Sequence, residues 1–239
     1  MPLPKINTPT YELVIPSTGK KVRYRPFLVR EEKILIMALE SEDMNQITNA
    51  IVEILTACIL TKGVKIIELA TFDIEYIFLN VRAKSVGEVI DVNVTCPDDG
   101  ATQIQTEINI DDIKVQKDKK HTNLIKLDDK LSMKMQYPSI KQFVENNFEV
   151  QNTTNVDQSL GMITACIEQV YSEDESWTAT DFSGDELKDF VEQMNTKQFK
   201  NIENFFTTMP KLSHKVTVKN PKTKVESDVV LEGLASFFS

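Results

Sequence analysis

Hydrophobic and polar residues alternate along three stretches of the chain, and each stretch is interrupted by a turn sequence that contains proline. The first stretch covers residues 11–24 around PSTG, the second covers residues 89–113 around CPDDG, and the third covers residues 216–231 around NPKT. Alternation with period two is typical of strands with one buried face, and Pro, Asp, Asn and Gly are the residues that tight turns prefer. The pattern therefore predicts three antiparallel β-hairpins.

Between the hairpins, the spacing of apolar residues changes to three and four, which is typical of helices. The helix that begins at Arg30 is apolar on all sides, so we expect it to be largely buried. The next helix is expected to end at Gly63, and Ser183 with Glu186 matches the capping-box pattern of a helix start. Other helices are predicted over residues 72–83, 138–144, 156–170 and 199–209, and short strands over residues 124–127 and 131–135. These elements predict an α+β fold of amphipathic helices packed with several antiparallel hairpins.

A charged and weakly patterned stretch at residues 116–130 divides the predicted elements into two groups. We expect residues 1–115 to hold the first two hairpins with their helices. Residues 116–130 would then be an exposed connection, and residues 131–239 a helical segment followed by the last hairpin.

The two halves share an order of parts: an aromatic-rich helix, a pair of alternating valines, a turn with proline and a returning strand. The sequence VNVTCP at residues 92–97 corresponds to VTVKNP at residues 216–221. Either the chain contains an internal duplication, or two hairpins with proline turns simply look alike. If the duplication is real, the two hairpin tips present similar docking surfaces.

Composition narrows the classes of protein that fit this pattern. The 239 residues are 41% hydrophobic and 26% charged, which is ordinary for a folded globular chain. The net charge of -9 repels a phosphate backbone, so we expect no nucleic-acid partner. No segment approaches a membrane span or a signal-peptide core. The three cysteines are odd in number and far apart, which favours a reducing compartment such as the cytosol.

Residues for catalysis are scarce. His121 and His214 are the two histidines, and neither has a Cys, Ser or Asp at motif spacing, so we expect both to be solvated loop residues. No phosphate-binding or metalloprotease motif occurs. Pairs of carboxylates are inevitable among 36 acidic residues and do not by themselves indicate a glycosidase. We therefore expect no catalytic residue, no cofactor and no small-molecule substrate, with Cys58 and Cys166 packed in the core.

The hairpin tips and the C-terminal end are the candidate sites for protein contacts. The CPDDG turn has a thiolate at Cys96, but Asp99 stands where a C-x-x-C zinc knuckle would place the second one, so we expect no metal. Two adjacent phenylalanines at a chain end must be covered, either by the body of the protein or by a partner. The candidate partner-binding residues are Pro97, Asp98, Asp99, Gly100, Pro221, Lys222, Leu234, Phe237 and Phe238.

Four strings carry a resemblance to a known family. They are RPFLVREEK at residues 25–33, MALE at residues 37–40, FDIEYIFLNVRAKSVGE at residues 72–88 and LEGLASFF at residues 231–238. With these strings, the chain resembles the baseplate hub proteins of T4-type tailed phages from about residue 2 to residue 238. Members of that family often carry a C-x-x-C-G knuckle in the central hairpin, from which Asp99 departs.

The resemblance implies a structural hub protein of a contractile phage tail that contacts other baseplate or tail proteins. Such a protein would be found in the host cytoplasm during assembly and then in the baseplate of the virion. The alternative is a transient assembly chaperone of the hub that is not retained in the virion. A cell-wall hydrolase is a third and weaker interpretation.

Overall fold

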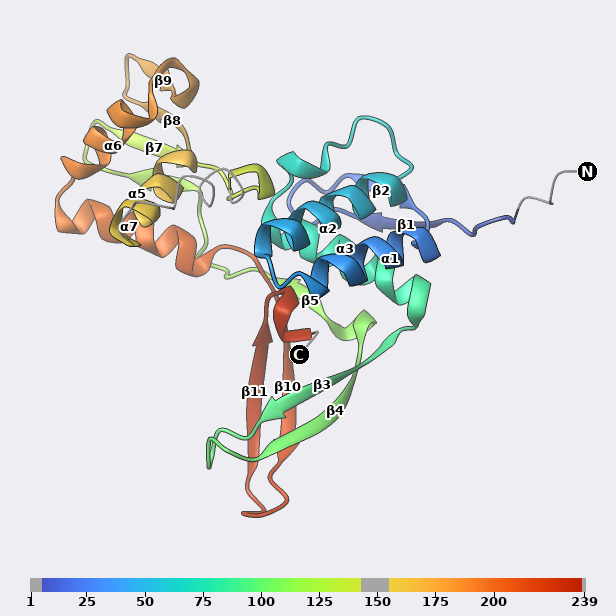
Figure 1. Ribbon diagram of the computed structural model, residues 1–239. Coiled ribbons are helices and arrows are strands. Elements are labelled where there is room, and N and C mark those ends of the chain that lie inside the picture. Colours follow the sequence, from blue (N-terminus) through green and yellow to red (C-terminus); the bar gives the residue numbers. More distant parts are fainter. Residues whose placement is uncertain (1–5, 143–154, 238–239) are drawn as a thin grey trace, which may run out of the picture. The chain divides into compact units, whose positions relative to one another are not determined.

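The fold is α+β and divides into two compact units. The computed structural model describes residues 6–142 and 155–237 (Figure 1). Unit 1 combines the chain up to Gln116 with the chain from Lys211 onward, and unit 2 covers Lys117–Pro210.

Unit 1 begins with a hairpin and a group of helices. Strands β1 and β2 pair antiparallel, with Leu13 opposite Val22. The helices pack in sequence order, α1 against α2 and α2 against α3, and α3 also contacts β5 and β10. The elements are β1 (Tyr11–Val14), β2 (Lys21–Tyr24), α1 (Val29–Glu40), α2 (Met44–Cys58), η1 (Ile66–Glu68) and α3 (Thr71–Val86).

The helix that is buried on most sides is α3, and the expectation of a buried helix from Arg30 onward is wrong. Eight residues of α3 are buried, among them Phe72, Ile77 and Phe78. In α1, only Glu31 and Ala38 are buried. Charged side chains are spread around α1, so only a narrow stripe of the helix can face α2, whereas α3 has neighbours on several sides.

Helix α2 ends at Cys58, before the predicted end at Gly63. The chain then becomes extended, and Ile59 forms a bridge with Tyr24 at the edge of β2. The Arg25 N–H donates to the Cys58 carbonyl (3.0 Å), and the Leu60 N–H donates to the Arg23 carbonyl (2.8 Å). The free edge of β2 thus offers backbone partners that compete with another helical turn.

The second and third predicted hairpins are confirmed, and together they form the lower part of unit 1 (Figure 1). Buried residues of both hairpins belong to one hydrophobic cluster, with Val92 and Val94 from one and Val216 and Val218 from the other. The sheet that holds the third hairpin has the order β11-β10-β5. The elements are β3 (Val89–Thr95), β4 (Gln103–Asn109), η2 (Ile110–Asp112), β5 (Lys114–Gln116), β10 (Lys211–Lys219), β11 (Glu226–Glu232) and η5 (Leu234–Phe237).

This division differs from the three parts expected from the sequence. The last hairpin, expected to belong with residues 131–239, lies in unit 1. Most of the expected connection belongs to unit 2, where the strand predicted over residues 124–127 forms as β6. The physical reason is pairing at long sequence distance, because Leu212 of β10 pairs with Val115 of β5. Both side chains pack in the core that the hairpins share.

Unit 2 is a four-stranded antiparallel sheet, ordered β6-β7-β8-β9, with helices. The predicted helix over residues 156–170 is partly wrong, because the helix ends at Ala165 and the chain continues as β8. The spacing of Ile167 and Val170 fits either element, and β8 forms because strands lie on both sides of it. The elements are β6 (Leu124–Lys126), β7 (Ser132–Met135), α5 (Asn155–Ala165), β8 (Ile167–Tyr171), β9 (Ser176–Thr178), η4 (Ala179–Asp181), α6 (Gly184–Glu192) and α7 (Thr196–Thr208).

Other predictions from local patterns can be compared directly with unit 2. The capping box is confirmed, since the Ser183 side chain accepts from the Glu186 N–H while the Glu186 carboxylate accepts from the Ser183 N–H (2.8 Å). Cys166, like Cys58 of unit 1, is fully buried as expected. The helix predicted over residues 138–144 extends to residues 143–144, which lie outside the described residues.

Candidate interaction surface

The loops of the three predicted hairpins have the same backbone geometry. In each loop, the carbonyl of the residue before proline accepts a hydrogen bond of 2.8–2.9 Å from the N–H of the residue four positions later. That later residue has a positive φ, which glycine adopts at least cost. The pairs are Ile15 with Gly19 (φ 68°), Cys96 with Gly100 (φ 63°) and Asn220 with Lys224 (φ 67°).

Two of these loops are each held by an aspartate from elsewhere in unit 1. Asp73, in the first turn of α3, accepts from the Ser17 N–H (2.9 Å) and from the Ser17 hydroxyl. Asp98, in the tip of the second hairpin, holds the loop of the third hairpin in the same way. The two hairpin tips that the sequence analysis proposed separately are therefore joined.

Three donor–acceptor contacts to the carboxylate of Asp98 join the two tips. The Asn220 Nδ2 lies 3.1 Å from both Oδ1 and Oδ2 of Asp98, and the Thr223 hydroxyl donates to Oδ2. Hydrogen bonds from Thr223 and then Asn220 lower the pKa of Asp98 below its ordinary value. Asn220 is buried to 1% exposure, so Asp98 satisfies an amide that water does not reach.

Around this joint, the candidate contact residues of both tips are exposed. Pro97, Gly100, Pro221 and Lys222 all lie at the surface of unit 1. Because Asp98 fixes one loop to the other, these side chains have a defined arrangement. A partner that binds both tips at once would not have to order two independent loops.

Asp99 closes its own loop. Its carboxylate accepts from the N–H groups of Ala101 (3.1 Å) and Thr102 (2.9 Å) and from the Thr102 hydroxyl. These bonds, with those from Thr102 strongest, hold the pKa of Asp99 far below its usual range.

The tips do not fit a zinc knuckle. Cys96 is fully buried, burial raises the pKa of its thiol, and the facing tip contributes the amide of Asn220 and the hydroxyl of Thr223. Across the part of the chain that the structure describes, no three His, Cys, Asp or Glu side chains are grouped so as to hold a metal ion.

Replacing Asp98 with alanine is expected to separate the two tips. Asn220 and Thr223 then lose their shared acceptor, so amide exchange across residues 219–226 should rise, as measured by hydrogen–deuterium exchange. Thr223→Val removes one of the same bonds and should have a smaller effect in the same segment. Asp91→Ala, on the exposed face of β3, is the matched control and should leave the tip unchanged. Unchanged protection in Asp98→Ala would contradict the joint.

The C-terminal end is covered by the body of unit 1 as far as Phe237. This residue is 1% exposed and belongs to the cluster shared by the two hairpins, and Leu234 packs against the same cluster. The Leu234 N–H donates to Glu75 Oε1 of α3 (3.1 Å), which anchors the turn η5. Of the two alternatives, the structure favours the body for Phe237. Phe238 lies outside the described residues.

Helix α1 carries an exposed apolar face that the sequence analysis missed. Val29, Ile36, Met37 and Leu39 are 80%, 49%, 60% and 51% exposed. Large apolar side chains that gather on one element and stay exposed indicate a contact surface. In the sequence of α1, the charged residues distributed among the apolar ones indicate exposure, because a buried helix would not carry them.

His121 is not a solvated loop residue, contrary to expectation. Its ring stacks with Tyr137 and lies against Phe205, with ring centroids 5.6 and 5.3 Å apart. Its Nδ1 is 3.0 Å from Thr208 Oγ1, and its Nε2 is 3.0 Å from the Tyr137 hydroxyl. The Thr208 hydroxyl donates to the Asn204 carbonyl, so it accepts from Nδ1–H, and Nε2 then accepts from Tyr137. His214 is also not in a loop, because it lies in β10 opposite Leu231.

This network predicts that unit 2 loses stability in acid. Burial, and then the charge of Lys117, lower the pKa of His121, with Asp118 acting in the opposite direction. A folded-state pKa below the unfolded value means that the stabilising effect of neutral His121 is complete above pH 6.5 and is lost as pH falls through the folded pKa. The melting temperature of the protein should fall over this range. His121→Gln should remove that part of the dependence, while the control His214→Gln should retain it.

The buried carboxylates Glu31 and Asp73 and the partly buried Glu75 of unit 1 serve the fold. Glu31 pairs with Arg25 (2.9 Å), Asp73 holds Ser17 and Glu75 holds the Leu234 N–H. Burial raises the pKa of Asp73 and of Glu75.

In the described ranges, no helix combines the length and the apolar character that crossing a bilayer requires.

Comparison with known proteins identifies a family. The family model described as T4 bacteriophage base plate protein matches residues 8–239, which is nearly the whole chain. No curated protein and no solved structure matches the chain. The match includes the α1 segment, both joined hairpins and all of unit 2.

Proposed function

The chain belongs to the family of T4 bacteriophage base plate proteins, and we propose from this that it is a structural hub protein of a contractile-tail baseplate. It acts by contact with other baseplate proteins. The proposal locates the protein in the host cytoplasm during assembly and then in the baseplate of the virion tail, as expected for this family.

The joined hairpin tips are the observation that supports this function best. Two hairpins far apart in sequence end in one exposed structure, held by Asp98, with Pro97, Pro221 and Lys222 at its surface. A fixed, projecting structure suits a permanent contact, because its conformation is set before the partner arrives. Under this proposal, the protein is not an enzyme and takes no cofactor, nucleic acid or small-molecule substrate.

A transient assembly chaperone of the hub is the second candidate, and the exposed face of α1 favours it. Its apolar residues alternate with charged ones such as Glu32, Lys33 and Glu40, which also lie exposed. A mixed surface of this kind is typical of non-obligate interfaces, in which both partners must be soluble before and after the contact.

Quantitative mass spectrometry of purified mature virions separates the two candidates. A fixed, low integral ratio to a known tail subunit is expected for a hub protein. Presence in baseplate precursors with absence from virions would favour the chaperone, and absence from both would overturn the assignment to the tail.

The tip itself is tested by charge reversal. Lys222→Glu should lower the ratio of this protein in virions, because the substitution alters the exposed end of the joined tips without touching a core residue. Lys200→Glu makes the same change on the exposed side of α7 in unit 2 and should leave the ratio unchanged. Equal incorporation of both variants would exclude the tips as the essential contact.

A further inference from the structure

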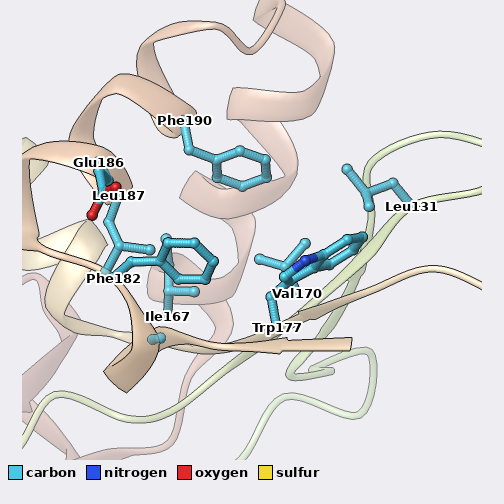
Figure 2. A pocket seen from close by; sticks show the side chains of 9 residues that line it. Leu131, Ile167, Val170, Trp177, Phe182, Glu186, Leu187 and Phe190 are labelled. Carbon is cyan, nitrogen blue, oxygen red and sulfur yellow. The ribbon is translucent and has the colours of Figure 1, made fainter. Parts of the chain in front are cut away.

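Unit 2 contains an open apolar pocket of about 400 Å³ that the proposed tip contacts do not use. Figure 2 shows Val170 of β8 and Trp177 of β9 on one side, with Leu187 and Phe190 of α6 opposite them. Phe182, at the C-cap of η4, lies beside Leu187 and also lines the pocket.

The residues that line the pocket remain partly exposed to solvent. Phe182 is 39% exposed, and Trp177, Leu187 and Phe190 are each intermediate in exposure. Covering apolar surface contributes roughly 25 cal/mol per Å², so an apolar group that fills this space gains affinity from each of these side chains. The pocket is also in the size range of sites that hold ligands in proteins.

The segment that builds most of the pocket carries almost the whole net charge of the protein. Residues 168–192 include nine acidic residues and one basic residue, Lys188, a formal charge of -8 within a chain of charge -9. The exposed acidic side chains are Glu173, Asp174, Glu175, Asp181, Asp185, Glu186, Asp189 and Glu192.

Four of these charged residues line the pocket or are next in sequence to a residue that does. Asp181, Asp185 and Asp189 adjoin the lining residues Phe182, Glu186 and Phe190, and Glu186 itself lines the pocket. An apolar hollow bordered by a single sign of charge is complementary to an apolar anchor on a segment of opposite charge.

We propose that this pocket binds a basic segment of another baseplate protein, which inserts a large apolar side chain between Trp177 and Phe190 while its Lys or Arg residues lie over the acidic rim. The inference rests on the proposed function for the identity of the partner. Steering by charge raises the rate of encounter, and burial of the anchor supplies most of the affinity.

Other occupants fit the pocket less well. A second copy of this chain would bring a body of charge -9 toward a segment of formal charge -8, which repels it. Nucleic acid and anionic lipid headgroups are repelled for the same reason. A neutral apolar molecule could enter the hollow, but it would make no use of the rim.

The protein reports on this pocket by its own fluorescence, because Trp177 is its single tryptophan. The probe is a tryptophan-free synthetic peptide with a central Phe-Leu pair flanked by lysines, titrated into the full chain with excitation selective for tryptophan. We expect a blue shift of the Trp177 emission and an affinity that weakens steeply with added salt.

Matched variants and peptides separate the two parts of the site. Reversing the rim charges Asp185 and Asp189 to lysine should weaken binding at least tenfold, while Asp91→Lys in unit 1 should not. A lysine peptide with serines in place of the apolar pair should leave the emission unchanged. Leu187→Arg should abolish the shift, and the rim variants provide the test should that variant not fold.

Three outcomes would overturn the proposal: no response to the lysine peptide, an equal response to an uncharged apolar peptide, or concentration-dependent dimerisation in sedimentation velocity that the rim variants abolish. The binding assay uses the isolated chain. A failure of the hub assignment in virions is therefore distinguishable from a failure of the pocket.

Discussion

Glu31→Ala is expected to destabilise unit 1 by about 3–5 kcal/mol, because it leaves a buried arginine without its partner. Glu31 is 3% exposed and accepts from Arg25 Nη2 (2.9 Å), from Arg30 Nε (2.7 Å) and from the Leu28 N–H (2.7 Å). The Arg25 side chain is only 12% exposed, so water cannot replace the carboxylate fully. Chemical denaturation monitored by circular dichroism measures the loss.

The neighbouring residue provides the control. Glu32 is exposed in the same turn of α1, so Glu32→Ala changes charge and helix propensity equally without breaking a buried pair. We expect it to alter stability by no more than about 0.5 kcal/mol. Equal losses in the two variants would mean that the carboxylate acts only through the helix dipole.

The same carboxylate predicts how the protein responds to acid. Burial opposes ionisation of Glu31, but hydrogen bonds from Arg25, Arg30 and the Leu28 N–H together lower its pKa from 4.5 to about 2. Because the folded pKa lies below the unfolded one, the stabilisation is present above pH 4.5 and is lost as pH falls toward 2. The shift corresponds to roughly 3 kcal/mol. Glu31→Gln should remove this part of the acid dependence.

Local sequence patterns predicted the elements that depend on residues close together in the chain. The three hairpins follow from alternation and turn residues, and the start of α6 follows from the Ser183 capping box. The string RPFLVREEK, which carried the family resemblance, has a structural explanation in the Arg25–Glu31 pair and the cap that Glu31 gives to the Leu28 N–H.

What depends on distant partners could not be predicted. Asp98 and Asn220 are 122 positions apart, and no feature of either turn indicates that one carboxylate joins both. The strand β8 has an apolar spacing that a helix shares, and only β7 and β9 on either side decide between them. Trp177 is the single tryptophan, and no local pattern marks it as a site residue, because the pocket forms only when β9 and α6 come together.

The burial of Phe237 has the second large consequence. Phe237→Ala is expected to destabilise unit 1 by about 3–5 kcal/mol, because it removes a ring from a packed cluster and leaves a cavity. That cluster includes Val92 and Val94 of one hairpin and Val216 of the other. Loss of the ring should therefore loosen both hairpins, with a lower denaturation midpoint and faster amide exchange in β3 and β10.

A control substitution that shortens an exposed side chain decides whether the end of the chain serves the fold or a partner. Val230→Ala removes apolar atoms from β11 at a position that is 56% exposed, so it should cost no more than about 0.5 kcal/mol. If Phe237→Ala were as mild in the isolated protein but lowered the ratio in virions, the ring would be a partner contact after all. A large loss of stability in the isolated protein instead assigns Phe237 to the core that positions the joined tips, and leaves Pro97, Pro221 and Lys222 as the surface that a partner can reach.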